Sequence, residues 1–230
     1  MSKTTLLDGI HYEIIQTGTG TKYALVKDVS KTFFKTGATV EIPNYVGDAP
    51  VVEISSEAFS DIDFIRVVKL PNTIDRIASW AFDHCEGLEV VEIETGKKDR
   101  VSLGNNAFSR CYSLRTIVYN GEIWLEGPGV FKDCKNLYNI PVIRQMLPDG
   151  TFSNCSSLTR IHVVGKTNIH NRVFAGSSIK ELFCHEELSW IAKDAETNES
   201  FANVTIITSK VTPMLEALAF LGQPIKIMGD

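Results

Sequence analysis

Ala107-Phe108-Ser109-Arg110-Cys111-Tyr112-Ser113-Leu114-Arg115-Thr116-Ile117-Val118-Tyr119 is one copy of a motif that recurs along most of the 230-residue chain. A phenylalanine at position zero is followed by cysteine at +3 and by apolar residues at +6, +9 and +11. Further copies start at Phe59, Phe82, Phe131, Phe152, Phe174 (one residue short) and, in degraded form, Phe201. Successive copies begin 21–27 residues apart, and such a period is typical of a solenoid whose units stack on their neighbours.

The offsets also predict where each unit buries its side chains. Apolar residues at +9 and +11 alternate with variable ones, which indicates a strand with one buried face. Strands at the same point of successive coils are expected to form a single parallel sheet along the solenoid. The phenylalanine and the +3 residue then enter the core from the adjoining turn, and segments 74–82, 101–106 and 123–129 are interpreted as outer arms between strands.

The unit resembles the BspA-like leucine-rich repeats, which read roughly Ala-Phe-x-x-Cys-x-x-Leu-x-x-Ile-x-Leu-Pro. Residues 58–71, 81–93 and 107–119 carry the resemblance, which extends over about residues 40–208. The Leu-Pro that ends the family's unit survives only at Leu70-Pro71. The resemblance implies a curved, right-handed leucine-rich-repeat coil that binds other molecules, and it implies no catalytic residues.

The fold class expected is a mainly β repeat solenoid with different structures at its two ends. Residues 1–50 are predicted to form an N-terminal β cap, with strands at 12–15 and 23–26 joined by a turn at 18–20. Residues 51–210 are predicted to form a solenoid of about six to seven coils. Residues 211–230 are predicted to form a C-terminal cap with a short helix, because Thr212-Pro213 is a helix-start signal and Gly222 a stop signal.

Composition and charge exclude several classes of protein. With 43% hydrophobic and 22% charged residues the chain is an ordinary globular sequence. A formal net charge of −5 argues against nucleic acid as the partner, and no apolar run is long enough for membrane insertion. The N-terminus lacks the apolar core of a signal peptide, which predicts a cytoplasmic or virion-associated protein, or a secreted or surface protein whose signal has been removed.

The cysteines and histidines do not predict a metal site. Four of the five cysteines occupy the +3 position of consecutive copies, which indicates a ladder of reduced, buried thiols rather than converging zinc ligands. His162 and His185 are expected to be neighbours on or beside adjacent strands, but two histidines without a third ligand are weak support for a metal. No catalytic or cofactor motif is present either, so the chain is predicted to be no enzyme and to need no cofactor.

The candidate binding surface is the outward face of the predicted sheet. Core packing does not require the identities at +8 and +10, which form two columns. The partner-binding candidates among them are Val67, Lys69, Val90, Glu92, Thr116, Val118, Asn139, Arg160, His162, Glu181 and Phe183. Val90, Val118, Pro141 and Phe183 are apolar residues predicted to face solvent, as interface residues do, although scattered apolar residues also occur on ordinary surfaces.

Two functions remain open at this point. The first is a non-enzymatic module, of adhesion or adaptor type, that binds another protein through the sheet face. The alternative is a structural or assembly component, such as a phage virion protein, that associates through the ends of the solenoid. A glycoside hydrolase would need two facing carboxylates, and Glu92 and Glu181 lie too many coils apart for that.

Overall fold

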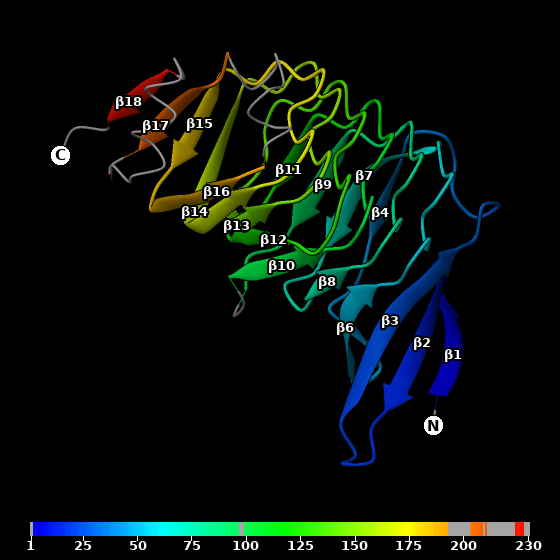
Figure 1. Cartoon of the computed structure of the whole chain (residues 1–230). Coiled ribbons are helices and arrows are strands. Elements are labelled where there is room, and N and C mark those ends of the chain that lie inside the picture. The colour runs from blue at the N-terminus through cyan, green and yellow to red at the C-terminus, as the bar shows by residue number, and fades with distance from the viewer. Residues whose placement is uncertain (1, 97–98, 193–202, 209, 211–223, 228–230) are drawn as a thin grey trace.

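The computed structural model describes residues 2–96, 99–192, 203–208, 210 and 224–227. Its strands are arranged in two sheets. Successive coils follow one another from the blue N-terminal end to the red C-terminal end in Figure 1. We call the four-stranded sheet β11-β9-β7-β4 the short sheet and the fourteen-stranded one the long sheet. The predicted mainly parallel β-solenoid is confirmed, and the described residues contain no helix.

The N-terminal cap contains the predicted hairpin and one further strand. β2 (Ile10–Gln16) and β3 (Lys22–Val29) pair antiparallel, and β1 (Ser2–Leu7) adds to the free edge of β2. On its other edge β3 pairs in parallel with β6 (Ala49–Ile54), to which β5 (Tyr45–Val46) adds antiparallel. The cap therefore continues the long sheet and covers the open end of the first coil.

The short sheet is built from the strands that the repeat predicts. It contains β4 (Ala38–Glu41), β7 (Ile65–Leu70), β9 (Val90–Ile93) and β11 (Thr116–Val118), all parallel. The +9 residues Val68, Val91 and Ile117 lie side by side in this register and are buried. Equal offsets in the sequence thus become equal positions in the sheet.

The fourth repeat copy interrupts the short sheet, contrary to the single continuous sheet that we expected. After β11 the ladder continues only as an isolated bridge between Thr116 and Asn139. Pro141 follows two residues later, and proline has no N–H to donate to a parallel ladder. The chain shifts there, so that Pro141 is buried rather than facing solvent and Val142 is half-buried rather than in the core.

The segments interpreted as outer arms contain a second strand in each coil, which is a correction to the sequence analysis. From these and the equivalent segments of later coils the long sheet takes up β8 (Arg76–Ile77), β10 (Arg100–Leu103), β12 (Glu122–Leu125), β13 (Ile143–Leu147) and β16 (Glu187–Ile191), as well as the second half of β14 (Arg160–Ile169). The first half of β14 and β15 (Glu181–Cys184) are strands that the repeat predicts, and beyond the break they too belong to the long sheet, followed by β17 (Thr205–Thr208) and β18 (Ile225–Ile227). Strand β14 is long enough to pair with both β15 and β16. The signal that we missed is a second apolar alternation before each phenylalanine, such as buried Val101 and Leu103 before Phe108.

The repeated phenylalanines form one continuous stack through the core. The rings of Phe59, Phe82, Phe108, Phe131, Phe152 and Phe174 are each at most 2% exposed. Neighbouring centroids lie 4.7 to 6.5 Å apart, and neighbouring ring planes differ by 3 to 21°. These are offset-stacking distances, so each coil is held to the next by aromatic packing as well as by backbone hydrogen bonds.

The +3 cysteines form a second ladder beside this stack. Each thiol donates a hydrogen bond to the carbonyl oxygen of the phenylalanine one coil earlier. The pairs are Cys85 with Phe59 at 2.9 Å, and Cys111 with Phe82, Cys134 with Phe108 and Cys155 with Phe131 at 3.0 Å. All five cysteines are free and buried, which confirms the predicted ladder of reduced thiols, and burial raises the pKa of the Cys111 and Cys134 thiols.

Two positions in every turn have a left-handed backbone. At −2 from the phenylalanine they are Glu57, Trp80, Asn106, Gly129, Gly150 and Arg172, and at +2 they are Asp61, His84, Arg110, Asp133, Asn154 and Gly176. Their φ angles lie between 51° and 66°. The turn between the two sheets requires this conformation in every coil, whichever residue type the sequence supplies.

Two sequence predictions fall on residues outside the described ones. They are the C-terminal helix at 212–222 and the start of the degraded copy at Phe201. Within the described part of the chain, no helix is long and apolar enough to span a membrane.

Candidate functional site

The two predicted columns lie on the outward face of the strands, as neighbours across the ladder. In the +8 column Val67 is paired with Val90, and Val90 with Thr116. In the +10 column Lys69 is paired with Glu92, and Glu92 with Val118. Val118 is 50% exposed, whereas Val67, Val90 and Thr116 are half-buried, so Val118 presents the most accessible apolar side chain of this group.

Polar contacts join the columns of the short sheet. The Lys69 ammonium lies 3.9 Å from the Glu92 carboxylate, which is a long and exposed ion pair. The Asn139 amide donates to the Thr116 hydroxyl at 3.1 Å and so holds the isolated bridge beside the sheet. These seven residues therefore form one continuous surface: Val67, Lys69, Val90, Glu92, Thr116, Val118 and Asn139.

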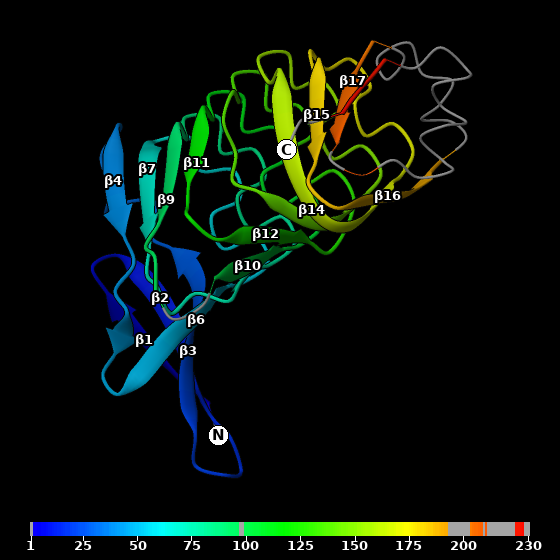
Figure 2. The same ribbon diagram turned by 90° about the vertical axis from the view of Figure 1, so that its left-hand side faces the viewer.

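The remaining candidates form a second group on β14 and β15. Arg160 and Glu181 are paired across the ladder with 3.7 Å between Nε and Oε2, and the His162 ring stacks on Phe183 with centroids 4.3 Å apart. Phe183 is half-buried rather than freely exposed. The break at Asn139 to Val142 separates this group from the short sheet, so the structure divides the predicted surface into two parts (Figure 2).

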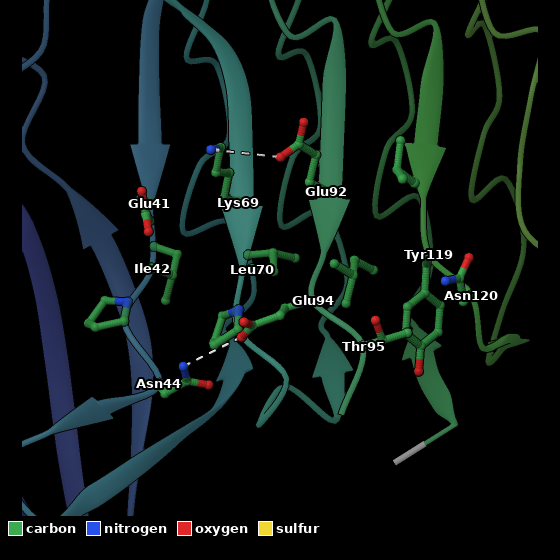
Figure 3. A pocket seen from close by; sticks show the side chains of 14 residues that line it. Glu41, Ile42, Asn44, Lys69, Leu70, Glu92, Glu94, Thr95, Tyr119 and Asn120 are labelled. Carbon is green, nitrogen blue, oxygen red and sulfur yellow. Dashed lines mark hydrogen bonds and ion pairs between the residues drawn. The ribbon is translucent and has the colours of Figure 1, made fainter. Parts of the chain in front are cut away.

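A groove of about 480 Å³ opens where the strands of the short sheet end. Figure 3 shows side chains from the ends of β4, β7, β9 and β11 converging on it. Its apolar wall contains Ile42, Pro43, Leu70, Pro71, Ile93 and Val118, and its polar lining contains Glu41, Asn44, Lys69, Glu92, Glu94, Thr95, Tyr119 and Asn120. Lys69, Glu92 and Val118 of the predicted surface thus also line the groove.

Sequence reasoning missed most of the groove because it considered the strands and not the residues that follow them. A signal was available in Ile42-Pro43 and Leu70-Pro71, since a proline directly after a strand ends its ladder. With the ladder ended, the chain turns away and leaves space above the next residues. The groove is therefore a consequence of repeated strand endings rather than of any single insertion.

Carboxylates outnumber ammonium groups in the groove. Glu41, Glu92 and Glu94 line it against Lys69 alone. Glu94 is held in place because its Oε2 accepts from Asn44 Nδ2 at 3.5 Å and from the Asn72 backbone N–H at 3.4 Å (Figure 3). The local excess of negative charge favours a cationic group as the occupant.

Tyr119 forms an aromatic part of the groove wall. Tyr119 is 9% exposed, and its ring packs closely against Gly121. A side chain at position 121 would clash with the ring, because its Cβ would lie 2.4 Å from Cζ of Tyr119. Burial, followed by the charges of Asp99 and Glu122, raises the pKa of its hydroxyl. The phenol therefore stays protonated at neutral pH. A charged-residue groove with apolar walls and an aromatic ring is suited to binding the aliphatic stem and head of a long basic side chain.

The short sheet thus combines an exposed apolar side chain, charged side chains and an adjoining groove on one face. Across the described residues, no three or more His, Cys, Asp or Glu side chains are grouped so as to hold a metal ion. The fold and the surface together define a two-sheet repeat solenoid with a phenylalanine and cysteine spine and a variable outward face.

Comparison with protein families identifies this solenoid. Residues 52–163, 98–203 and 127–225 match the BspA type leucine rich repeat region, in six copies. The chain belongs to this family, as the resemblance of its repeat unit led us to expect. A comparison with curated proteins finds no match.

A solved structure of a bacterial protein shares the fold. A leucine rich cell surface protein from Faecalibacterium prausnitzii superposes with a TM-score of 0.69 at 23% identity, over 90% of this chain and 54% of that protein. This chain therefore spans about half the length of that relative. A leucine rich repeat protein from T. pallidum matches with a TM-score of 0.46 at 24% identity, over 76% of this chain and 89% of that one.

Proposed function

We propose that this chain is a non-enzymatic protein-binding module that takes its partner on the face of the short sheet and in the adjoining groove. The observation that carries the proposal is the position of Val118. It is a half-exposed apolar side chain in the outward column, and it also lines the groove. A partner on this surface would cover an apolar centre and meet charged residues around it, as stable interfaces do.

The charges of the groove suggest which part of a partner enters it. Three carboxylates and one ammonium group line it, and the groove extends across the ends of β4, β7, β9 and β11. An extended polypeptide segment with a lysine or arginine side chain fits this lining. Its cationic head would lie near Glu41 and Glu92, and its aliphatic stem would pack along Pro43, Pro71 or Tyr119.

The test compares two exposed apolar residues. The partner is captured from the native cell by crosslinking to the full chain and identified, and its affinity is then measured for purified variants. Val118→Glu is expected to abolish binding, because it places a charge in the centre of the interface. Leu6→Glu is the matched control, since Leu6 is 58% exposed but lies on β1 in the cap. Loss of binding in the control with retention in Val118→Glu would overturn the proposal.

A second candidate function is assembly through the ends of the solenoid. It is favoured by β1, which is paired only with β2 among the described strands and carries the exposed Leu6 and Leu7. An open strand edge with apolar side chains is a template for pairing with another chain. Light scattering after size-exclusion chromatography distinguishes the candidates, since assembly predicts oligomers that Leu6→Glu disperses.

We also propose that the protein is displayed on a bacterial cell surface. The relative from Faecalibacterium prausnitzii is described as a cell surface protein, and display on a bacterial surface would leave the short sheet open to partner proteins. The sequence leaves open a cytoplasmic or virion-associated location and a secreted or surface location, and this proposal takes the surface location. Protease treatment of intact native cells tests it, because only a surface-displayed chain is degraded while cytoplasmic markers stay intact.

A further inference from the structure

His162 and His185 form a pair that the proposed binding function does not use. His162 lies on β14, and His185 directly follows the end of β15, the next strand of the long sheet. Nδ1 of His162 and Nε2 of His185 are 3.0 Å apart. The ring centroids lie 5.3 Å apart, and the ring planes differ by 20°. The centroid distance exceeds the distance between the two nitrogens by about two ring radii. The facing nitrogens therefore lie between the two rings and share one hydrogen bond, in which either nitrogen can be the donor.

Surrounding side chains fix one ring and leave the pair accessible. The His162 ring is stacked on Phe183 at 4.3 Å with 5° between the planes, so its orientation is held by the next strand. His185 is exposed and His162 half-buried, which gives an ion in solution access to the nitrogens. The backbone N–H of His185 donates to the Val163 carbonyl at 3.0 Å and fixes the second residue beside the first.

The form of the rings decides whether they can act as ligands. Neutral imidazole, with a free lone pair on one ring nitrogen, is the form that binds metals. When both rings are neutral, one facing nitrogen carries a hydrogen and the other accepts it.

We propose that His162 and His185 bind a divalent transition-metal ion, Cu²⁺ or Zn²⁺, between Nδ1 of His162 and Nε2 of His185. Metal–nitrogen distances of about 2.0–2.1 Å in a tetrahedral site place two ligand nitrogens roughly 3.3 Å apart. From the present 3.0 Å the pair must open by a few tenths of an ångström, and each ring must turn by roughly 35° so that its lone pair points at the ion instead of at the other ring. The hydrogen between the rings moves to the other nitrogen of the same imidazole, and both rings ligate as neutral groups. Water completes the coordination.

Other side chains compete little for the ion. The five cysteines are all buried. His84 lies 3.4 Å from Asp61, and His170 lies 3.7 Å from Asp149, so each of these histidines offers one imidazole and one exposed carboxylate. The sequence predicts no metal site because it shows no third ligand beside the two histidines, and the described residues supply no third His, Cys, Asp or Glu ligand there either. The two-imidazole site therefore relies on water for its other ligands and on the facing geometry of the two rings.

Isothermal titration calorimetry of the full chain with Cu²⁺ and with Zn²⁺ at neutral pH tests the proposal. We expect saturable binding that is tighter for Cu²⁺ than for Zn²⁺. His162→Ala and His185→Ala should each weaken metal binding by more than about tenfold. Mutating a residue that only hydrogen-bonds to a metal ligand already lowers metal affinity by roughly 10- to 100-fold. His170→Ala should leave it unchanged. Pulsed electron paramagnetic resonance of the Cu²⁺ complex should detect two imidazole nitrogens, and one in either variant.

Any of three outcomes would overturn the proposal. The double variant His162→Ala/His185→Ala could bind the metal ion as tightly as the unaltered chain, or His170→Ala could lose as much affinity as the His162 and His185 variants. The unaltered chain could also show only one imidazole ligand. Thermal unfolding without metal is measured for each variant, and His185→Gln provides a second variant at an exposed position where folding is not at risk. The result does not depend on the partner-binding proposal, because the probe is the metal ion alone.

Discussion

The thiol of Cys111 donates a 3.0 Å hydrogen bond to the carbonyl oxygen of Phe82, one coil earlier in the solenoid. The relationship recurs at Cys85, Cys134 and Cys155, so each of these cysteines joins its own coil to the phenylalanine of the preceding one. The first copy has Ile62 at this position, which has no donor and packs in the apolar core.

Cys111→Ala should lower the free energy of unfolding by about 2–3 kcal/mol, through a lost hydrogen bond and a small void. Cys184→Ala is the matched control. Cys184 is equally buried, but no thiol–carbonyl hydrogen bond of this kind joins it to a neighbour in the described part of the chain. We expect the control to cost about 1 kcal/mol less. Equal losses in denaturant titrations would mean that the thiol contributes only its volume.

Ser177→Cys should stabilise the protein. Ser177 takes the +3 position after Phe174, and its buried hydroxyl oxygen has no hydrogen-bond partner among the described residues. A thiol there would extend the ladder toward Phe152, with an expected gain of about 1 kcal/mol in the free energy of unfolding. Ser177→Ala removes the unpaired hydroxyl without adding a donor. If the alanine variant is as stable as the cysteine variant, the thiol does not complete the ladder.

Left-handed turn positions predict opposite effects of two substitutions. Glu57 has a φ of 61°, and Gly150 occupies the equivalent position four coils later with the same φ. Glu57→Gly should raise the free energy of unfolding by up to about 1 kcal/mol, because glycine adopts this region without steric cost. Gly150→Ala should lower it by about 1 kcal/mol, since a Cβ there meets no atom within 4 Å and the effect is backbone strain alone.

The control for the turn is Glu57→Ala, which shortens the side chain but keeps a Cβ at the left-handed position. It should not reproduce the gain of Glu57→Gly. Thermal unfolding of the three variants measures these differences, and a gain in Glu57→Ala equal to that in Glu57→Gly would assign the effect to lost charge.

Acid should weaken the pair between Glu122 and Arg144. The guanidinium of Arg144 donates to both carboxylate oxygens across β12 and β13, and this hydrogen bonding lowers the pKa of Glu122 from its ordinary value of 4.5. A depressed carboxyl pKa contributes stability that is fully present above the unfolded value and is lost as the pH falls through the folded value. Glu122→Gln should therefore cost about 1 kcal/mol at pH 7 and progressively less in acid.

Denaturant titrations between pH 7 and pH 3 measure this dependence. Glu181→Gln serves as the control, because its contact with Arg160 is longer, at 3.7 Å, and more exposed. The control should change stability little at either pH. A cost for Glu122→Gln that is independent of pH would contradict the assignment.

Much of the core was predictable because the same requirement is repeated in every coil. Phe108 and Leu114 are each supported by residues at equal offsets in other copies, and those at Phe59, Phe82, Phe131 and Phe152 and at Ile65, Leu88, Leu137 and Leu158 all lie in the core. The second sheet could have been predicted in the same way, because buried Val101 and Leu103 of β10 alternate with more exposed residues before Phe108. Where one copy departs from the pattern, as at Pro141, the repeat no longer predicts which side is buried.

The binding surface was predictable only as two columns of residues. Whether Val118 is exposed depends on which neighbours the chain places above it, and the groove beside it depends on four strands ending at one level. The division of the columns into two groups likewise follows from a ladder that breaks beyond β11.

The sequence by itself determined the period of the repeat, its phenylalanine and cysteine spine and the family, because each buried position recurs about once per coil. Only the tertiary structure decided that two sheets enclose the core, that carboxylates from β4 and β9 share one groove, and that His162 faces His185. The physical reason is that these contacts join residues about one coil or more apart in the chain. Their distances depend on register and twist between coils, which no local pattern encodes.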